Sequence, residues 1–252
     1  MSTDQTSPAG PALAPENTAP PLDERPLWGV KDVIILALVT FFWIVVGQVV
    51  FQILMNATGL SRNTGSPASP IAEFGSSIVF YSTILLISLL YLKLRGYSFS
   101  LRVLGFRRTR FWKAVLWTAL IFVLDIAGTI AWVSLVKSEP PPVKTEYGVT
   151  VLGVTLAVLG IAVMAPVVEE LFFRGIIFQG FSNRFRFLAA APMSAVVFAL
   201  FHIDPRVYGR IFISGVLFAF LFYRTRSLWP SIGCHVIGNT IAVIALFASN
   251  SS

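Results

Sequence analysis

Two histidines occur in this 252-residue chain, and both lie in long apolar stretches. His202 ends the run Phe-Ala-Leu-Phe-His, and His235 begins the run His-Val-Ile-Gly-Asn. A third polar island, Glu169-Glu170-Leu-Phe-Phe-Arg174, lies upstream and is again surrounded by apolar residues. Ionisable groups are costly inside a bilayer unless they are paired, so their default interpretation there is a functional site. The three islands therefore predict one shared polar pocket.

The acidic island has helical spacing. Residues four apart share a helix face, and acid before base is the favourable order. We therefore expect an ion pair between Glu170 and Arg174 within the helix. Glu169 lies about 100° away around the helix and is expected to face another helix. The alternative is that these charges mark the membrane boundary and reach water.

His202 is expected at the same depth as Glu169. Glu169 lies 15 residues before Arg184, and His202 lies 15 residues after Phe187, on the two sides of a predicted turn. At about 1.5 Å per residue both side chains lie roughly 22 Å from that turn. An imidazole against an unpaired carboxylate can activate a water molecule as general base. A plain hydrogen bond between helices is the alternative for such a histidine.

His235 and Asn239 are four residues apart and share a helix face. Their two donors, directed at one spot, would suit a developing oxyanion. Polar contact between helices explains the pair equally well. Phe198 lies four residues before His202 and is expected to form a packing wall behind the imidazole ring.

The composition indicates an integral membrane protein, with 56% hydrophobic and 12% charged residues. Soluble domains carry about 25% charged residues. We predict an all-α fold, a polytopic transmembrane bundle of about seven to eight helices around an intramembrane polar cavity. The fourth span is either one tilted helix or two short helices that meet at Pro166. The expected spans are 33–56, 72–93, 112–136, 150–181, 187–203, 208–223 and 228–248.

The net charge of +7 does not indicate nucleic-acid binding, because the basic residues follow the positive-inside pattern of membrane loops. The segment 93–113 carries seven basic residues and no acidic residue. If the basic loops are cytoplasmic, seven spans place the N-terminus inside and the C-terminus outside.

Three regions are expected. Residues 1–27 are rich in Pro, Ala, Ser and Thr and predict a disordered N-terminal tail. Residues 28–149 predict accessory transmembrane helices, and 150–248 hold the polar islands and the expected chemistry. Asp125 lies deep in a span and could line the pocket, support it or bind a basic group. Cys234 is the only cysteine, and we interpret it as a packing residue.

The three motifs together resemble the CPBP (Abi) intramembrane protease family, which includes type II CAAX prenyl proteases and bacteriocin-processing proteins. The resemblance covers roughly 150–245. The resemblance implies that Glu169 and His202 activate water. It also implies that His235 and Asn239 stabilise the oxyanion, and that Glu170 and Arg174 brace the motif helix.

The resemblance implies an endopeptidase that cuts a peptide bond near the membrane surface, without a covalent intermediate, cofactor or metal. It also implies a multi-pass protein, expected in a bacterial inner membrane, whose substrate is a membrane-associated peptide or protein. A prenylated substrate is not implied, because no feature of the chain selects one. The sequence gives no oligomeric state.

Other classes stay open at this level. Two histidines and a carboxylate can hold zinc, although the chain has no His-Glu-x-x-His run. A non-catalytic membrane immunity or scaffold protein could bind a peptide in the same pocket. A proton-coupled transporter could use Asp125 and Glu169, but no inverted repeat is visible.

Overall fold

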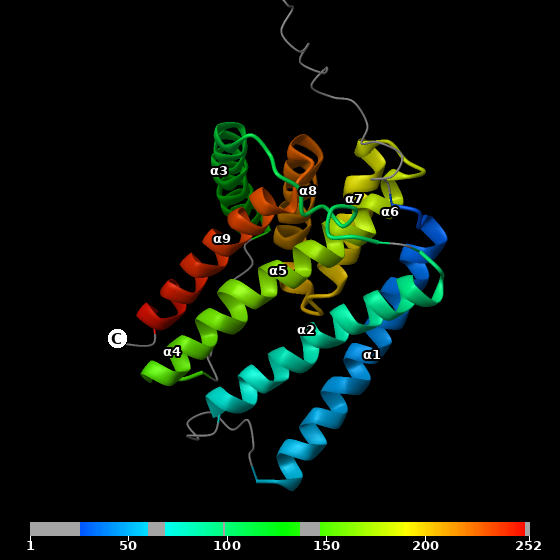
Figure 1. Ribbon diagram of the computed structural model, residues 1–252. Helices are drawn as coiled ribbons and strands as arrows, with labels where there is room; N and C mark the ends of the chain where they lie inside the picture. The colour runs from blue at the N-terminus through cyan, green and yellow to red at the C-terminus, as the bar shows by residue number, and fades with distance from the viewer. Residues whose placement is uncertain (1–25, 60–68, 98, 137–146, 250–252) are drawn as a thin grey trace, which may run out of the picture.

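The computed structural model describes residues 26–59, 69–97, 99–136 and 147–249, which contain helices and turns but no strand. The predicted all-α membrane bundle is therefore confirmed (Figure 1). In chain order the helices are α1 Val30–Ala57, α2 Ser69–Leu94, α3 Phe111–Val136, α4 Val151–Ala157, η2 Val158–Met164, α5 Ala165–Glu170, η3 Leu171–Phe178, α6 Gln179–Ser182, α7 Phe187–Leu200, η4 Pro205–Val207, α8 Tyr208–Thr225 and α9 Leu228–Ser249.

The fourth hydrophobic segment forms one continuous helical run, Val151–Ser182, and not two helices. Two of its stretches, η2 and η3, have the wider π-helical register. At the end of η2 the Ala165 N–H donates to the Gly160 carbonyl, five residues earlier. In the same register the Ile161 carbonyl would pair with residue 166, which is a proline and has no N–H. This carbonyl is therefore left for a partner outside the helix.

Six helical segments of the described residues are long and apolar enough to cross a membrane. The remaining apolar helix, α7, has only 14 residues. At 1.5 Å per residue it falls short of a hydrocarbon core of about 30 Å. The sequence predicted a span over 187–203, but the helix ends at Leu200, and His202 lies in the turn that follows.

The outer faces of the long helices are apolar. Several large side chains there are more than half exposed, among them Leu38, Phe42, Leu86 and Leu135. In α3 only Ile121 is buried. Such surfaces are expected to contact lipid, because exposed apolar patches of this extent are rare on soluble monomers.

The Val151–Ser182 run lies at the centre of the bundle, between α2 and α9 (Figure 1). α7 packs against η3 and against α8, and α3 packs against α8 and α9. Gly215 allows the close approach of α8 to α7, since a Cβ at this position would lie 2.8 Å from the Cβ of Ala195. This packing directs side chains from both halves of the chain towards the central run.

The segment before α1 is anchored to the central run. Trp28 is fully buried, and its indole Nε1 donates to the Ile176 carbonyl at 3.0 Å. Asn183 donates to the carbonyls of Trp28 and Pro26 at 2.7 and 2.9 Å. The predicted disordered tail falls almost entirely on residues 1–25, which lie outside the described residues.

One buried carboxylate ties the start of α1 to the end of α2. Asp32 accepts hydrogen bonds from the Gly29 N–H, the Tyr91 hydroxyl, Arg95 Nε and the Tyr97 hydroxyl, at 2.8 to 3.1 Å. The hydrogen bond to Asp32 raises the pKa of the Tyr97 phenol. The acid thus satisfies several donors at once and fixes α1 against α2.

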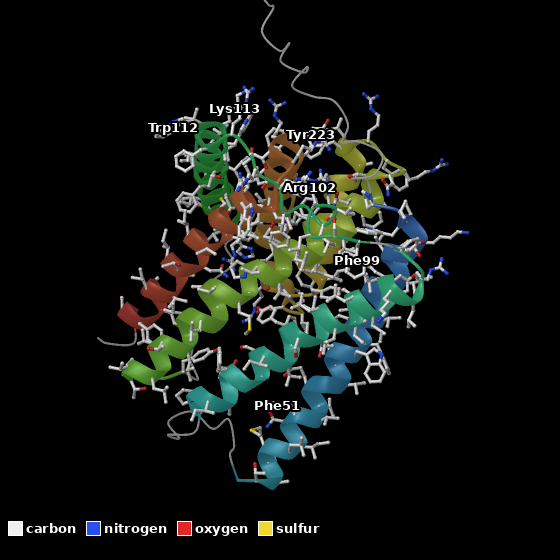
Figure 2. The ribbon with its side chains drawn as sticks, viewed as in Figure 1. Phe51, Phe99, Arg102, Trp112, Lys113 and Tyr223 are labelled. Carbon is white, nitrogen blue, oxygen red and sulfur yellow. The ribbon has the colours of Figure 1, made fainter. Side chains whose placement is uncertain are left out.

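This cluster lies on the side that carries the basic residues. Figure 2 shows Arg102, Lys113 and Tyr223 towards one end of the bundle, whereas Phe51 lies towards the other end. By the positive-inside rule, the end with Arg102 and Lys113 is expected to face the cytoplasm.

Asp32→Asn should reduce the free energy of unfolding by about 2 kcal/mol, because the charged acceptor of several hydrogen bonds is lost. Chemical unfolding in detergent, followed by tryptophan fluorescence, measures this change. Lys31→Gln is the matched control, since Lys31 is exposed and adjacent. Equal stability of the two variants would show that the Asp32 cluster does not hold α1 in place.

Candidate active site

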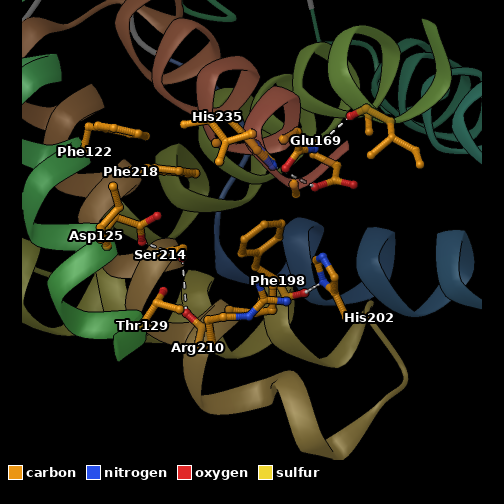
Figure 3. A pocket seen from close by; sticks show the side chains of 18 of the residues that line it. Phe122, Asp125, Thr129, Glu169, Phe198, His202, Arg210, Ser214, Phe218 and His235 are labelled. Carbon is orange, nitrogen blue, oxygen red and sulfur yellow. Dashed lines mark hydrogen bonds and ion pairs between the residues drawn. The ribbon is translucent and has the colours of Figure 1, made fainter. Parts of the chain in front are cut away.

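A cavity of about 460 Å³ lies among α2, α3, α5, α7, α8 and α9 (Figure 3). Glu169, His202, His235 and Asn239, which the sequence selected, all line it. Phe198 also lines it, whereas Glu170 and Arg174 are buried behind it. Further polar groups on its wall come from three other helices, and these are Ser77, Tyr81, Asp125, Thr129, Arg210 and Ser214.

Glu170 and Arg174 form the expected ion pair, with 2.8 Å between Glu170 Oε1 and Arg174 Nη1. Neither side chain reaches solvent, since their exposed fractions are 0% and 1%. Arg174 Nη2 also donates to the Gly215 carbonyl of α8 at 3.3 Å. The alternative of solvated boundary charges is therefore wrong for this pair. Removing either partner of a buried pair leaves an uncompensated charge, at a cost of about 3–5 kcal/mol.

Two aromatic rings enclose the Arg174 guanidinium. Its carbon atom lies 4.5 Å from the ring centroid of Phe198 and 5.2 Å from that of Phe218. The Phe198 ring also contacts the His202 imidazole edge-to-face, with 4.9 Å between centroids. The predicted packing wall behind His202 is present, and the same ring additionally covers the arginine.

Glu169 faces away from the Glu170–Arg174 ion pair, towards α2 and α9. Its Oε1 accepts a hydrogen bond from the Tyr81 hydroxyl of α2 at 3.1 Å. Its Oε2 lies 3.9 Å from His235 Nε2 on α9. The carboxylate is thus held at the cavity wall, mostly buried, by a phenol from the region that the sequence had assigned to accessory helices.

His202 is held through one ring nitrogen. Its Nδ1 lies 2.9 Å from the Phe198 carbonyl oxygen. A carbonyl only accepts hydrogen bonds, so Nδ1 carries the proton and Nε2 of the neutral ring remains an acceptor. Figure 3 shows this ring across the cavity from Glu169.

Glu169 and His202 both line the cavity, but no direct hydrogen bond joins them. The sequence argument placed Glu169 against His202, but the structure gives no hydrogen bond between these two described residues. Both instead line a smaller second cavity of about 150 Å³, together with Tyr81. A cavity of this volume, with a carboxylate, a phenol and an imidazole on its wall, can hold water that has several hydrogen-bond partners.

The turn that carries His202 is strained. Ile203 has a φ of 60°, a left-handed conformation that is rare for a β-branched residue. The Asp204 N–H donates to the His202 carbonyl at 2.6 Å. The Asp204 carboxylate accepts hydrogen bonds from Arg206, which lower the pKa of that carboxyl group. Strain of this kind persists where the surrounding structure enforces it and clusters at functional sites.

His235 lies between the two glutamates. Its Nδ1 is 3.1 Å from Glu170 Oε1, and its Nε2 faces Glu169. Asn239 Nδ2 donates to the Ile161 carbonyl at 2.8 Å, which is the carbonyl left free by the π register and Pro166. The two donors therefore have separate partners and do not converge on one atom, in contrast to the sequence argument. The second amide hydrogen of Asn239 is available to the cavity.

The far wall of the cavity is also polar. Asp125 Oδ1 accepts a hydrogen bond from the Ser214 hydroxyl at 2.6 Å, and Arg210 lines the same wall (Figure 3). Of the alternatives considered for Asp125, the structure thus places it in the pocket. Cys234 is buried among apolar side chains that include Ile121, which agrees with a packing role.

Sequence reasoning missed Tyr81, Arg210 and Ser214. The signal for Tyr81 was a phenol within an apolar span, but tyrosines are also common at membrane interfaces. Its depth relative to Glu169 depends on how α2 packs against α5, which no local pattern encodes.

Comparisons with known proteins agree with the motif pattern. Residues 149–241 match the family described as type II CAAX prenyl endopeptidase Rce1-like. The putative membrane peptidase YdiL of Bacillus subtilis (strain 168) is 34% identical over 91 residues, which are 36% of this chain and 37% of that protein. The membrane-embedded CAAX protease MroQ of Staphylococcus aureus (strain USA300) is 25% identical over 138 residues, 52% of this chain and 56% of that protein.

No solved structure matches the chain. The alignments span 37% and 56% of the length of the two curated relatives. With six apolar spans among the described residues, the chain is a multi-pass integral membrane protein. Its segment 149–241, which contains every motif residue from Glu169 to Asn239, is similar to the Rce1-like CAAX protease family, in agreement with the resemblance of the three motifs.

Proposed function

We propose that this chain is an intramembrane endopeptidase in which Glu169 and His202 activate water to hydrolyse a peptide bond near the membrane surface. The observation that carries the proposal is the arrangement of these two residues on one small cavity. His202 is fixed there through Nδ1, so its Nε2 is free to take a proton. The family assignment of residues 149–241 supports the same activity.

In this proposal the water molecule lies between the carboxylate and the imidazole. One of the two takes a proton from water as the oxygen attacks the carbonyl carbon of the peptide bond. The proton then passes to the amine that leaves. Tyr81 holds Glu169 in place through its hydroxyl, so that one carboxylate oxygen points in a fixed direction. No covalent bond forms between enzyme and substrate.

His235 and Asn239 are proposed to stabilise the oxyanion that develops on the carbonyl oxygen. Glu170 accepts from His235 Nδ1 and thereby orients the ring. Its Nε2 lies at the cavity wall, 3.9 Å from Glu169 Oε2, where an N–H would direct a donor into the site. The free hydrogen of the Asn239 amide adds a second donor. Preorganised donors of this kind contribute several kcal/mol in a site that excludes water.

The proposed substrate is a membrane-associated peptide or protein. The cavity of about 460 Å³ lies within the apolar bundle and has polar groups on opposite walls. A peptide backbone that enters it can find donors and acceptors that the bilayer itself does not offer. The names of the relatives indicate CAAX and membrane peptidase activity for those proteins, and a peptide bond is the chemistry that both names share.

Glu169→Gln and His202→Asn should each lower the cleavage rate at least about 100-fold, because each removes a group that takes the proton. Quantitative proteomics of membranes from expressing cells, with enrichment of new peptide termini, measures the cleavage. Glu73→Gln is the matched control, since it makes the same chemical change on α2 outside both cavities.

Each variant should unfold in detergent within a few degrees of the wild type. Retention of the new termini in folded Glu169→Gln protein would refute the proposed chemistry. A wild-type phenotype in that variant without any cleavage would instead favour the non-catalytic scaffold.

Tyr81→Phe should slow cleavage by about tenfold, because loss of one hydrogen bond to the carboxylate costs about 1.4 kcal/mol. The same terminal-peptide assay reports the effect. Tyr208→Phe removes a hydroxyl outside both cavities and should have no effect. Equal rates for Tyr81→Phe and wild type would show that the Tyr81 hydrogen bond does not position Glu169 in the active state.

A strong chelator should leave cleavage unchanged if water is activated by Glu169 and His202 alone. Among the described residues, no group of three or more His, Cys, Asp or Glu side chains is arranged as a metal site. Activity of purified protein before and after chelation, together with elemental analysis, tests this expectation. Stoichiometric zinc, with activity that disappears on chelation and returns on zinc addition, would establish the metalloprotease alternative.

A further inference from the structure

A third cavity, of about 610 Å³, lies where the turn between α6 and α7 meets the end of α8. Three arginines line it, Arg184, Arg186 and Arg226, and we name it the arginine groove. It is distinct from the candidate active site, since no residue lines both cavities.

Among the described residues, the arginine groove carries positive charge without a matching acid. The part of its lining that the structure describes contains no Asp or Glu, and its three arginines form no ion pair there. Arg184 and Arg186 are exposed, whereas Arg226 is half-buried. Burial lowers the pKa of Arg226, which reflects the cost of holding a guanidinium away from water. An anionic ligand would offset this cost.

The backbone at Arg226 is held in an unusual conformation. Its φ is 53°, in the left-handed region where glycine usually ends a helix. The Arg226 N–H donates to the Phe222 carbonyl at 2.7 Å. The next two residues are fixed to the loop before α3, through Ser227 Oγ to the Arg107 carbonyl and the Leu228 N–H to the Gly105 carbonyl. These contacts hold the backbone at Arg226 and thereby fix the point from which its side chain enters the groove.

Aromatic rings form the floor of the groove. The Arg226 guanidinium lies 4.9 Å from the ring centroid of Tyr223, and that ring packs against Phe187 with 4.9 Å between centroids. The amides of Gln179 and Asn183 are already engaged with backbone carbonyls. The groove therefore offers guanidinium groups above an apolar surface, which suits a ligand with an anionic head and an apolar body.

We propose that the arginine groove binds a phosphate group carried by an anionic lipid headgroup. The planar fork of a guanidinium matches phosphate oxygens in a bidentate manner. Tyr223 lies towards the same end of the bundle as Arg102 and Lys113 in Figure 2, which is the end expected at the cytoplasmic headgroup layer. Lipid phosphates are concentrated at that level, and the aromatic floor can pack against the glycerol and acyl carbons.

The full-length protein in nanodiscs provides the test. One set of nanodiscs contains phosphatidylcholine only, and a second contains phosphatidylcholine with phosphatidylglycerol. Native mass spectrometry measures the phosphatidylglycerol retained after release, and thermal unfolding measures the stabilisation. Arg226→Gln should reduce retention by about tenfold, the loss expected for one charge-assisted contact. Arg186→Gln should also reduce it and is less prone to misfolding, since Arg186 is exposed.

Arg110→Gln is the matched control, because Arg110 is an exposed arginine outside the groove, next to the start of α3. It should retain phosphatidylglycerol as the wild type does. Glu169→Gln should do so as well, which separates this site from the proposed peptidase activity. Inorganic phosphate titrated into the phosphatidylcholine nanodiscs distinguishes the source of the ligand. Stabilisation in that arm that Arg226→Gln abolishes would support a phosphate site open to free phosphate.

The proposal is overturned if Arg226→Gln and Arg186→Gln both retain phosphatidylglycerol and respond to phosphate as the wild type does. It is equally overturned if Arg110→Gln loses as much binding as Arg226→Gln, since the effect would then be one of general surface charge.

Discussion

The buried Glu170–Arg174 ion pair constrains the positions of the helices around it, because neither charge reaches water. Two charges inside an apolar bundle need further polar or aromatic contacts to offset their desolvation. These contacts come from different helices, namely the Gly215 carbonyl on α8, the Phe198 ring on α7 and His235 on α9, although Glu170 Oε2 and Arg174 Nε have no hydrogen-bond partner among the described residues. The pair therefore fixes three helices around the central run and, through His235, reaches the cavity where the chemistry is proposed.

The π-helical register of the central run has a similar effect on α9. A wider helical turn before Pro166 leaves the Ile161 carbonyl without a partner in its own helix, and Asn239 supplies the missing donor. An unsatisfied carbonyl in a membrane costs several kcal/mol, so this contact positions α9 as well as Asn239 itself. The proline thus acts through the hydrogen bond that it cannot make.

Residues outside the segment that matches the Rce1-like family also build the cavity. Residues 149–241 supply Glu169, His202 and the His235–Asn239 pair, but Tyr81 comes from α2 and Asp125 from α3. Helices α2 and α3 complete the walls, and Trp28 and Asp32 lock α1 to the bundle through buried hydrogen bonds. The division into accessory and chemical halves therefore describes where the motifs lie, whereas the site needs both halves.

The sequence by itself determined the all-α membrane fold, the family resemblance and the local pair Glu170–Arg174. These depend on hydropathy and on spacing within one helix, which a chain encodes locally. Only the tertiary structure decided that Tyr81 holds Glu169, that Asn239 binds the Ile161 carbonyl, and that Glu169 and His202 line one small cavity without a direct hydrogen bond. Such contacts depend on the depth and rotation of one helix against another. Those are set by packing across the whole bundle, because apolar helix faces of similar hydropathy can pack in many registers.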